Sequence, residues 1–109
     1  MSYKIKALAD FEKELKRLSK KYKSLGLDIT NLITILRENP TLGTPIGKNL
    51  YKLRLAISSK NQGKSGGERL ITCFQVIEET VYLVYIYDKS EINNISEKKI
   101  KELAKNFEK

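Results

Sequence analysis

The stretch "ERLITCFQVIEETVYLVYIY", residues 68–87, decides the fold. Both halves are rich in β-branched and aromatic residues, which favour strands. The pair Glu78-Glu79 separates the halves and predicts a tight turn between two antiparallel strands. Residues 80–87 are apolar on both faces of the second strand, so this strand is expected to lie inside the sheet rather than at its edge.

A third strand is predicted upstream in "LYKLRLAI", residues 50–57, and completes an antiparallel meander. Successive side chains of a strand point to opposite faces. One face carries Tyr51, Leu53, Leu55 and Ile57, and the other carries Leu50, Lys52, Arg54 and Ala56.

Helices are predicted before this meander. Residues 10–22 have apolar positions at helical spacing, with Asp10 as N-cap, and a second helix is expected from Asp28 to a point before Asn39-Pro40. These two helices should form a hairpin that packs on one face of the sheet. Residues 3–8 predict a short edge strand, whereas residues 40–49, "PTLGTPIGKN", predict a loop.

A third helix is predicted in "ISEKKIKELAKNF", residues 95–107. Ser96 is a suitable N-cap, and Ile95 and Ile100 have the spacing of a hydrophobic staple. Its apolar stripe of Ile100, Leu103, Ala104 and Phe107 is expected to be core. The predicted fold is therefore α+β, in the order β-α-α-β-β-β-α, as a single domain over residues 1–109.

The charge of the chain indicates which kind of partner it binds. There are 21 Lys and Arg residues against 13 Asp and Glu residues, for a net charge of +8. Six basic residues and one acidic residue fall between positions 48 and 69. This concentration favours an anionic partner, nucleic acid above all, although a basic protein that is merely soluble stays an alternative.

The residue types that are missing exclude other functions. There is no histidine, which rules out a Ser-His-Asp triad or a histidine-ligated metal, and no metal or other cofactor is expected. The single cysteine, Cys73, cannot form an internal disulfide and should pack inside a strand, which suits a reducing cytoplasm. No apolar run approaches the roughly 20 residues of a membrane span, and the N-terminus does not resemble a signal peptide, so a cytoplasmic location without a membrane partner is expected.

The stretch "NQGKSGGER", residues 61–69, contains Gly63-Lys64-Ser65, the last three letters of a phosphate-binding P-loop. Ser58 stands where the first glycine of that motif is required, and a strand follows where a helix should begin. Without the helix N-terminus the phosphate site is lost. The segment is therefore interpreted as a basic connection between two strands.

Several charged residues are expected to meet on the sheet. Lys52 and Arg54 leave the same face of their strand, and Arg69 begins the next strand. Tyr87, Lys89 and Glu91 follow at the end of the third strand. If this face points away from the helical hairpin, it becomes a cationic floor that no helix covers, which suits an extended polyanion. The alternative is that these are ordinary solvent-facing positions of a half-buried strand.

The sequence resembles the RelE/ParE superfamily of bacterial toxins, in particular its RelE/HigB-type branch. The resemblance covers the last two thirds of the chain well. The matching positions are Leu50, Lys52, Leu53, Arg54, Ala56, Gly63, Lys64, Ser65, Gly66, Gly67, Arg69, Ile71, Ile86, Tyr87, Lys89 and Glu91. Tyr51 departs from the pattern, because many relatives have arginine there.

The resemblance implies an mRNA interferase, a toxin of a type II toxin–antitoxin system. It would cut mRNA on the ribosome, near the 16S rRNA, and so inhibit translation. A co-expressed acidic antitoxin would hold it inactive, in a toxin–antitoxin hetero-oligomer. Position by position, Lys52, Arg54, Arg69 and Lys89 are the catalytic candidates, and Lys48, Lys60 and Lys64 are candidates for RNA binding.

RNA can be cut without a metal when its own 2′-OH attacks the adjacent phosphate. That reaction needs a base at the 2′-OH, cations on the phosphate and an acid at the leaving 5′-oxygen. A lysine surrounded by other cations can supply the base, so Lys52 and Lys89 are candidates, with Glu91 as an alternative. Arg54 and Arg69 would stabilise charge on the phosphoryl oxygens. Tyr87 is expected either to stack on a base or to belong to the core.

Two other functions stay open at this stage. The first is a ParE-like inhibitor of DNA gyrase without nuclease activity, because the fold is shared and cannot decide. The second is a basic RNA-binding module without catalytic activity. The basic pair in the strand and the arginine of the next strand favour the nuclease.

Overall fold

Five strands form one sheet in the order β1-β5-β4-β3-β2. The structure is a computed structural model and describes residues 2–58 and 67–107. Its elements are β1 (Lys4–Ala7), α1 (Ala9–Lys21), α2 (Leu25–Leu36), β2 (Thr44–Gly47), β3 (Leu50–Leu55), β4 (Glu68–Gln75), β5 (Thr80–Asp88), α3 (Glu97–Ala104) and a 3-10 turn (Lys105–Phe107).

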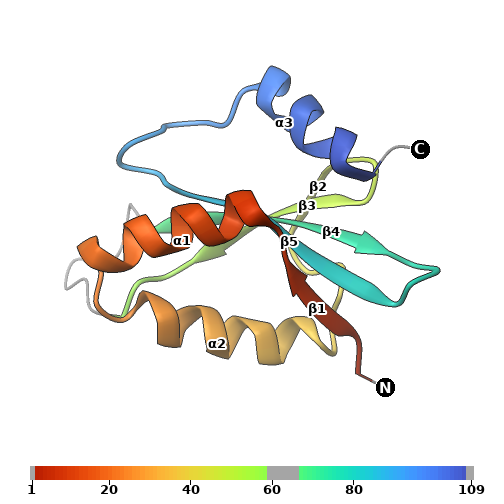
Figure 1. Cartoon of the computed structure of the whole chain (residues 1–109), viewed down its shortest axis with the longest axis horizontal. Coiled ribbons are helices and arrows are strands. Elements are labelled where there is room, and N and C mark those ends of the chain that lie inside the picture. The colour runs from red at the N-terminus through yellow and green to blue at the C-terminus, as the bar shows by residue number, and fades with distance from the viewer. Residues whose placement is uncertain (1, 59–66, 108–109) are drawn as a thin grey trace.

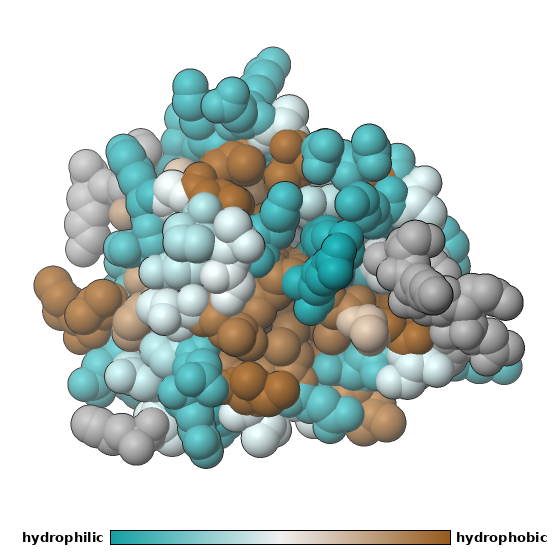
Figure 2. All heavy atoms as spheres, turned by 180° about the vertical axis from the view of Figure 1, so that it is seen from behind, coloured by the Kyte–Doolittle hydropathy of each residue, from teal (hydrophilic) through white to brown (hydrophobic). Residues whose placement is uncertain are grey.

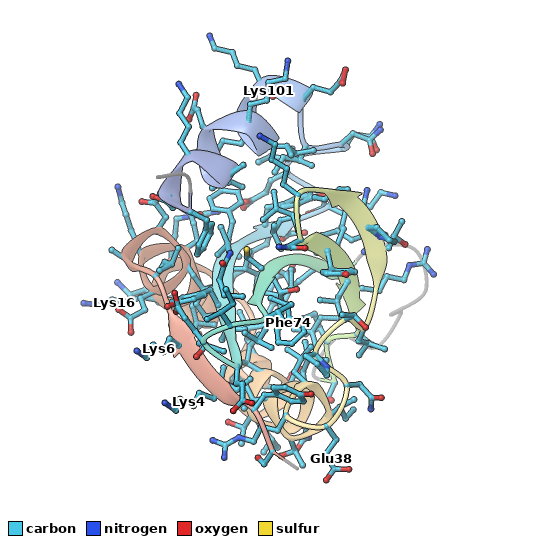
Figure 3. The ribbon with its side chains drawn as sticks, turned by 90° about the vertical axis from the view of Figure 1, so that its right-hand side faces the viewer. Lys4, Lys6, Lys16, Glu38, Phe74 and Lys101 are labelled. Carbon is cyan, nitrogen blue, oxygen red and sulfur yellow. The ribbon has the colours of Figure 1, made fainter. Side chains whose placement is uncertain are left out.

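The predicted meander is confirmed. β3, β4 and β5 are antiparallel neighbours, and β5 lies inside the sheet between β4 and β1. β1 is the short edge strand expected near the N-terminus, and it pairs with β5 in parallel, from Lys4 opposite Thr80 to Ala7 opposite Leu83. The lysines of β1, Lys4 and Lys6, project from an outer edge of the molecule (Figure 3). The expected α+β class is therefore correct, with a mixed sheet.

Helices cover both faces of the sheet, with α2 on one side and α3 on the other (Figure 1). The larger core lies under the helical hairpin, as predicted. It contains Phe11, Leu18, Leu25, Ile29, Leu32, Leu36, Leu53, Leu55, Ile57, Leu70, Leu83 and Ile86. The smaller core lies under α3 and contains Leu50, Ile71, Cys73, Val84, Tyr87 and Leu103. The prediction that no helix covers the outer face was wrong, because α3 packs on part of it.

The starts of the first two helices differ from the prediction. Leu8, rather than Asp10, is the N-cap of α1, and Asp10 lies in the first turn, where a carboxylate complements the helix dipole. α2 begins at Leu25, three residues before Asp28. Asp28 is buried, and its Oδ2 accepts hydrogen bonds from the Ser58 N–H at 3.0 Å and the Ser24 hydroxyl at 2.8 Å. It therefore ties the chain after β3 to α2 instead of capping the helix.

The segment predicted as a loop, residues 40–49, contains the short strand β2. Thr44 lies opposite Lys52 and Pro45 opposite Tyr51, with an irregular register before Gly47. Proline is tolerated because β2 is an edge strand and has a neighbour on one side only. Composition alone hides such a strand, since its residues are those of a turn.

The C-terminal helix follows the prediction closely. The Ser96 hydroxyl accepts a hydrogen bond from the Lys99 N–H at 3.1 Å, so Ser96 is the N-cap. Ile95 and Ile100 both pack against the smaller core, together with Ala104 and Phe107. Cys73 is buried, as expected.

Candidate nucleic-acid site

The pairing of β3, β4 and β5 places the predicted site residues next to one another. Arg54 lies directly opposite Arg69, and Arg69 lies opposite Tyr87. These three side chains therefore share one face of the sheet. Lys52 is two residues from Arg54 and leaves the same face. The side chain of Leu53, between them, joins the larger core on the opposite face.

The turn after β5 brings Lys89 to the same place. The Lys89 N–H donates a hydrogen bond to the carbonyl oxygen of Gly67 at 3.2 Å, immediately before β4. Gly67 has a φ of +81°, and a Cβ at this position would lie 2.9 Å from the carbonyl oxygen of Leu55. Only glycine permits the start of β4 to approach the end of β3 this closely.

A cleft of about 490 Å³ lies beside the edge of β3, where β2 stops pairing at Lys52. Its lining residues are Leu32, Leu42, Gly43, Thr44, Lys52, Leu53, Arg54, Arg69 and Lys89. We call this feature the cationic cleft. Hydrophilic and hydrophobic residues meet in the middle of the face that carries β2 and β3 (Figure 2).

The charge of the cationic cleft has one sign. Four of its lining residues are basic, and none of those in residues 2–58 and 67–107 that line it is acidic. Arg54 is exposed, Lys52 and Lys89 are half-buried, and Arg69 is 8% exposed. Like charges held this close repel one another, and a bound anion relieves that repulsion. The geometry therefore suits a phosphate chain.

The structure brings Lys52, Arg54, Arg69 and Lys89 together in the cationic cleft, whereas Tyr87, Lys48 and Glu91 are not among the residues that line it. Tyr87 is 2% exposed and belongs to the smaller core, so the structure decides for core packing, and burial raises the pKa of its hydroxyl. Lys60 and Lys64 lie outside the described residues.

Lys48 lies at a different groove, between the β2–β3 turn and α3. This groove measures about 440 Å³. Its lining residues are Ile46, Gly47, Lys48, Leu50, Glu97, Ile100, Lys101, Ala104 and Lys105. The lining combines apolar side chains from the strands and the helix with three lysines and one acidic residue, Glu97.

Glu91 belongs to a second charged cluster, which we call the α1 ion-pair cluster. Its carboxylate accepts two hydrogen bonds from Arg17, at 2.7 and 3.2 Å, and lies 3.5 Å from Lys21 Nζ. These partners hold the pKa of Glu91 below its usual value, with the Arg17 hydrogen bonds as the main cause. A carboxylate engaged in this way is poorly suited to remove a proton from RNA.

Asp88 is the buried centre of the α1 ion-pair cluster. Its Oδ2 accepts hydrogen bonds from Lys21 Nζ at 2.9 Å and the Tyr22 hydroxyl at 2.7 Å. Its Oδ1 accepts from the N–H and the hydroxyl of Ser90 at 2.9 and 2.8 Å. Burial alone would raise the pKa of Asp88, but these donors outweigh it and hold the pKa well below its usual value.

Sequence reasoning missed the apolar part of the cationic cleft. Leu32, Leu42 and Leu53 line it together with Gly43. The available signal was Gly43, because a glycine inside a segment that turns back along a strand often marks a close backbone approach. Gly43 has a φ of +109°, and a Cβ there would lie 2.7 Å from the carbonyl oxygen of Lys52.

Two further observations concern metals and membranes. Within residues 2–58 and 67–107, no three acidic or cysteine side chains gather in a way that could hold a metal ion. No helix among these residues is long and apolar enough to cross a membrane.

Fold and site together define a small basic α+β protein with a cleft suited to a polyanion. The sequence model of the family described as "RelE toxin of RelE / RelB toxin-antitoxin system" matches residues 11–109. The chain therefore belongs to the RelE toxin family, which confirms the resemblance noted from the sequence.

One solved structure supports the fold assignment. A double arginine-to-alanine mutant of the E. coli toxin RelE in the free state matches with a TM-score of 0.68 and 16% identity, over 99% of this chain and 100% of that one. At this identity the likeness concerns the fold alone. The intact E. coli RelBE toxin–antitoxin complex matches with a TM-score of 0.49 and 17% identity, over 78% of this chain and 94% of that one.

Proposed function

We propose that this protein is a ribosome-dependent endoribonuclease that cuts mRNA without a metal and so inhibits translation. Membership of the RelE toxin family supports a toxin. The observation that carries the proposal is the convergence of Lys52, Arg54, Arg69 and Lys89 in one cleft whose described lining contains no carboxylate. Such a cleft attracts phosphate and offers fixed positive charge where a transition state needs it.

In the proposed reaction the 2′-oxygen of RNA forms a bond to the adjacent phosphorus while the bond from phosphorus to the 5′-oxygen breaks. The 2′-OH loses its proton to a base, and the leaving 5′-oxygen gains one from an acid. The products are a 2′,3′-cyclic phosphate and a 5′-hydroxyl. We assign Arg54 and Arg69 to the phosphoryl oxygens, and Lys52 and Lys89 to the two proton transfers.

The make-up of the cationic cleft supports a need for the ribosome. None of its lining residues in the described part of the chain is aromatic, because Tyr87 is buried. Stacking on aromatic side chains is the usual way in which a protein holds single-stranded RNA in a defined position. A cleft without such rings holds phosphates but positions a base weakly, so we propose that the ribosome, near its 16S rRNA, positions the mRNA.

We further propose an acidic antitoxin as partner, in a hetero-oligomer in the cytoplasm. The family description names a toxin–antitoxin system, and the net charge of +8 suits an acidic protein. The groove beside α3 is lined by apolar side chains and by three lysines against one acidic residue, Glu97, and it suits an amphipathic segment with acidic residues.

The test is translation of a defined mRNA in vitro by EDTA-treated protein, with the new 5′ ends mapped. Wild type is compared with Arg54→Ala and Lys89→Ala, with and without ribosomes. The matched control is Lys16→Ala, which removes one charge from the exposed side of α1 (Figure 3). We expect ribosome-dependent cuts that both cleft variants lose and the control keeps.

Intact mRNA with wild-type protein would overturn the proposal. A DNA supercoiling assay with gyrase then distinguishes the two remaining functions. Inhibition of gyrase would indicate a ParE-like toxin, and no inhibition would leave a non-catalytic RNA-binding module.

A further inference from the structure

The cationic cleft has a second chemical character beside its charge. Leu32, Leu42 and Leu53 line it together with the four basic residues. Leu32 and Leu53 are mostly covered by the larger core, whereas Leu42 is 38% exposed. Leu42 is therefore the apolar side chain that a ligand in the cleft can contact.

The backbone fixes Leu42 in this position. Its N–H donates a hydrogen bond to the Asn39 carbonyl oxygen at 3.2 Å, which closes the turn after α2. On its other side, Gly43 lies so close to β3 that an added Cβ would be 2.7 Å from the Lys52 carbonyl oxygen and 2.9 Å from Leu53 Cγ. Thr44 then pairs with Lys52. Leu42 is thus held beside the start of the row of cations rather than on a free loop.

A nucleotide has two chemical parts that complement the charged and the apolar parts of the cleft. Its phosphate is anionic, and the faces of its base are largely apolar. We propose that Leu42 forms a subsite for a nucleobase, next to the cations that take the phosphate. This inference rests on the proposed function, since it names how the substrate RNA lies in that site.

The subsite should accept bases with little selectivity. A leucine side chain offers no hydrogen-bond donor or acceptor, so it cannot read the edges of a base, whereas its contact with a base face grows with the area covered. A purine should therefore bind more tightly than a pyrimidine at this position. Sequence preference of the cut must then come from elsewhere, such as the ribosome.

Other exposed apolar residues do not line the cleft and supply controls. Leu27, on α2, is 63% exposed and is absent from the cleft lining. Leu27→Ala removes the same atoms as Leu42→Ala at a site where no RNA is expected. Both positions are exposed, so both variants should keep the melting temperature of wild type, within the usual range for surface changes.

The experiment has a cleavage arm and a binding arm. The first measures kcat and KM for ribosome-dependent cleavage by wild type, Leu42→Ala, Leu42→Met and Leu27→Ala. The second measures the Kd of the same proteins at low salt for a short single-stranded RNA and for an abasic oligonucleotide of the same length, which keeps the phosphates and lacks the bases.

We expect Leu42→Ala to raise KM and the Kd for RNA about fivefold, which corresponds to the lower end of the range for a base stacked on an aromatic ring. Leu42→Met should restore most of the affinity because it keeps the apolar volume, and Leu27→Ala should match wild type. For the abasic oligonucleotide, Leu42→Ala and wild type should bind equally, because no base is left to lose contact.

The two proposals fail in different ways. If wild type cuts or binds RNA and Leu42→Ala equals it, or if the loss persists with the abasic oligonucleotide, the subsite is wrong and the proposed function stands. If wild type neither cuts nor binds RNA, the proposed function fails and the subsite fails with it.

Discussion

The cationic cleft and the α1 ion-pair cluster use the same basic residue types for opposite purposes. In the ion-pair cluster, Arg17 and Lys21 meet the carboxylates of Glu91 and Asp88 at 2.7 and 2.9 Å. In the cleft, Lys52, Arg54, Arg69 and Lys89 line a space whose described walls contain no carboxylate. The basic side chains of the first region are paired with carboxylates, whereas the described lining of the second region contains basic side chains and no carboxylate.

The two regions are joined through the end of β5. Asp88 and Glu91 turn toward α1, whereas Lys89, between them in the sequence, lines the cationic cleft. The Glu91 N–H and the Ile92 N–H also donate to the Asp88 carbonyl oxygen, which tightens this turn. The acidic residues nearest to Lys89 in the sequence are thereby paired with α1, and Lys89 is left to the cleft.

The largest effect is expected when a carboxylate is placed in the cationic cleft. Thr44 is exposed, lines the cleft and lies opposite Lys52. Thr44→Glu should reduce RNA cleavage about 100-fold, because a negative charge within a few ångströms of the phosphate costs several kcal/mol when water is partly excluded. Cleavage rates in the reconstituted translation assay measure this.

Thr41→Glu is the matched control for that variant, since Thr41 is also exposed but is not part of the cleft lining. It should cleave like wild type. Equal losses in both variants would mean that overall charge, rather than the cleft, governs activity.

The α1 ion-pair cluster can be broken at Asp88. Asp88 is 0% exposed, and its carboxylate accepts four hydrogen bonds. Asp88→Asn should lower the free energy of unfolding by about 2 kcal/mol, since the amide loses the charge that strengthens these bonds and cannot accept all of them. Urea unfolding measures the change. Glu91→Gln, at a more exposed position, should cost less, and the reverse order would contradict the assigned roles.

The pH dependence of stability follows from the same carboxylate. The pKa of Asp88 is lowered in the folded state, so its contribution is present above about pH 4, the unfolded pKa of aspartate, and is lost as the pH falls toward the folded value. Wild type should therefore lose stability below about pH 4. In thermal melts, the melting temperature of Asp88→Asn should fall less steeply than that of wild type as the pH is lowered. Asp28, whose pKa is also lowered, should keep part of the slope in both proteins.

The smallest expected effect concerns salt. If the four cations each neutralise one phosphate of single-stranded RNA, log K should fall with log salt at a slope of about −3. Arg54→Ala should reduce the slope to about −2, whereas Arg17→Ala should leave it unchanged because Arg17 is already paired with Glu91. Equal slopes for wild type and Arg54→Ala would place Arg54 outside the RNA contact.

Much of this arrangement was predictable from the sequence. Period-two alternation in residues 50–57 placed Lys52 and Arg54 on one face, and the pairing of β3 with β4 then put Arg69 opposite Arg54. The N-cap at Ser96 was also predicted from its neighbours in the chain and is confirmed, whereas the predicted N-cap at Asp10 is not.

The features of the site that could not be predicted from the sequence depend on tertiary contacts. The position of Leu42 beside the cations arises from the approach of Gly43 to β3, and the glycine indicates a close approach without indicating which strand it approaches. Glu91 looked like part of the site because it follows Lys89 closely, yet Arg17, 74 residues away in the sequence, holds it elsewhere. For Tyr87 the sequence left base stacking and core packing open, and the structure places the ring in the smaller core under α3.

The parallel pairing of β1 with β5 has a consequence for the order in which the protein forms. β1 is synthesised before β5, but Lys4 pairs with Thr80, which is 76 residues further along the chain. Contacts between segments so distant in sequence slow folding, because the chain must close a long loop before it gains from them. The cleft needs Lys89 as well, which comes directly after β5. The cleft therefore cannot form until β5 and Lys89 have been synthesised.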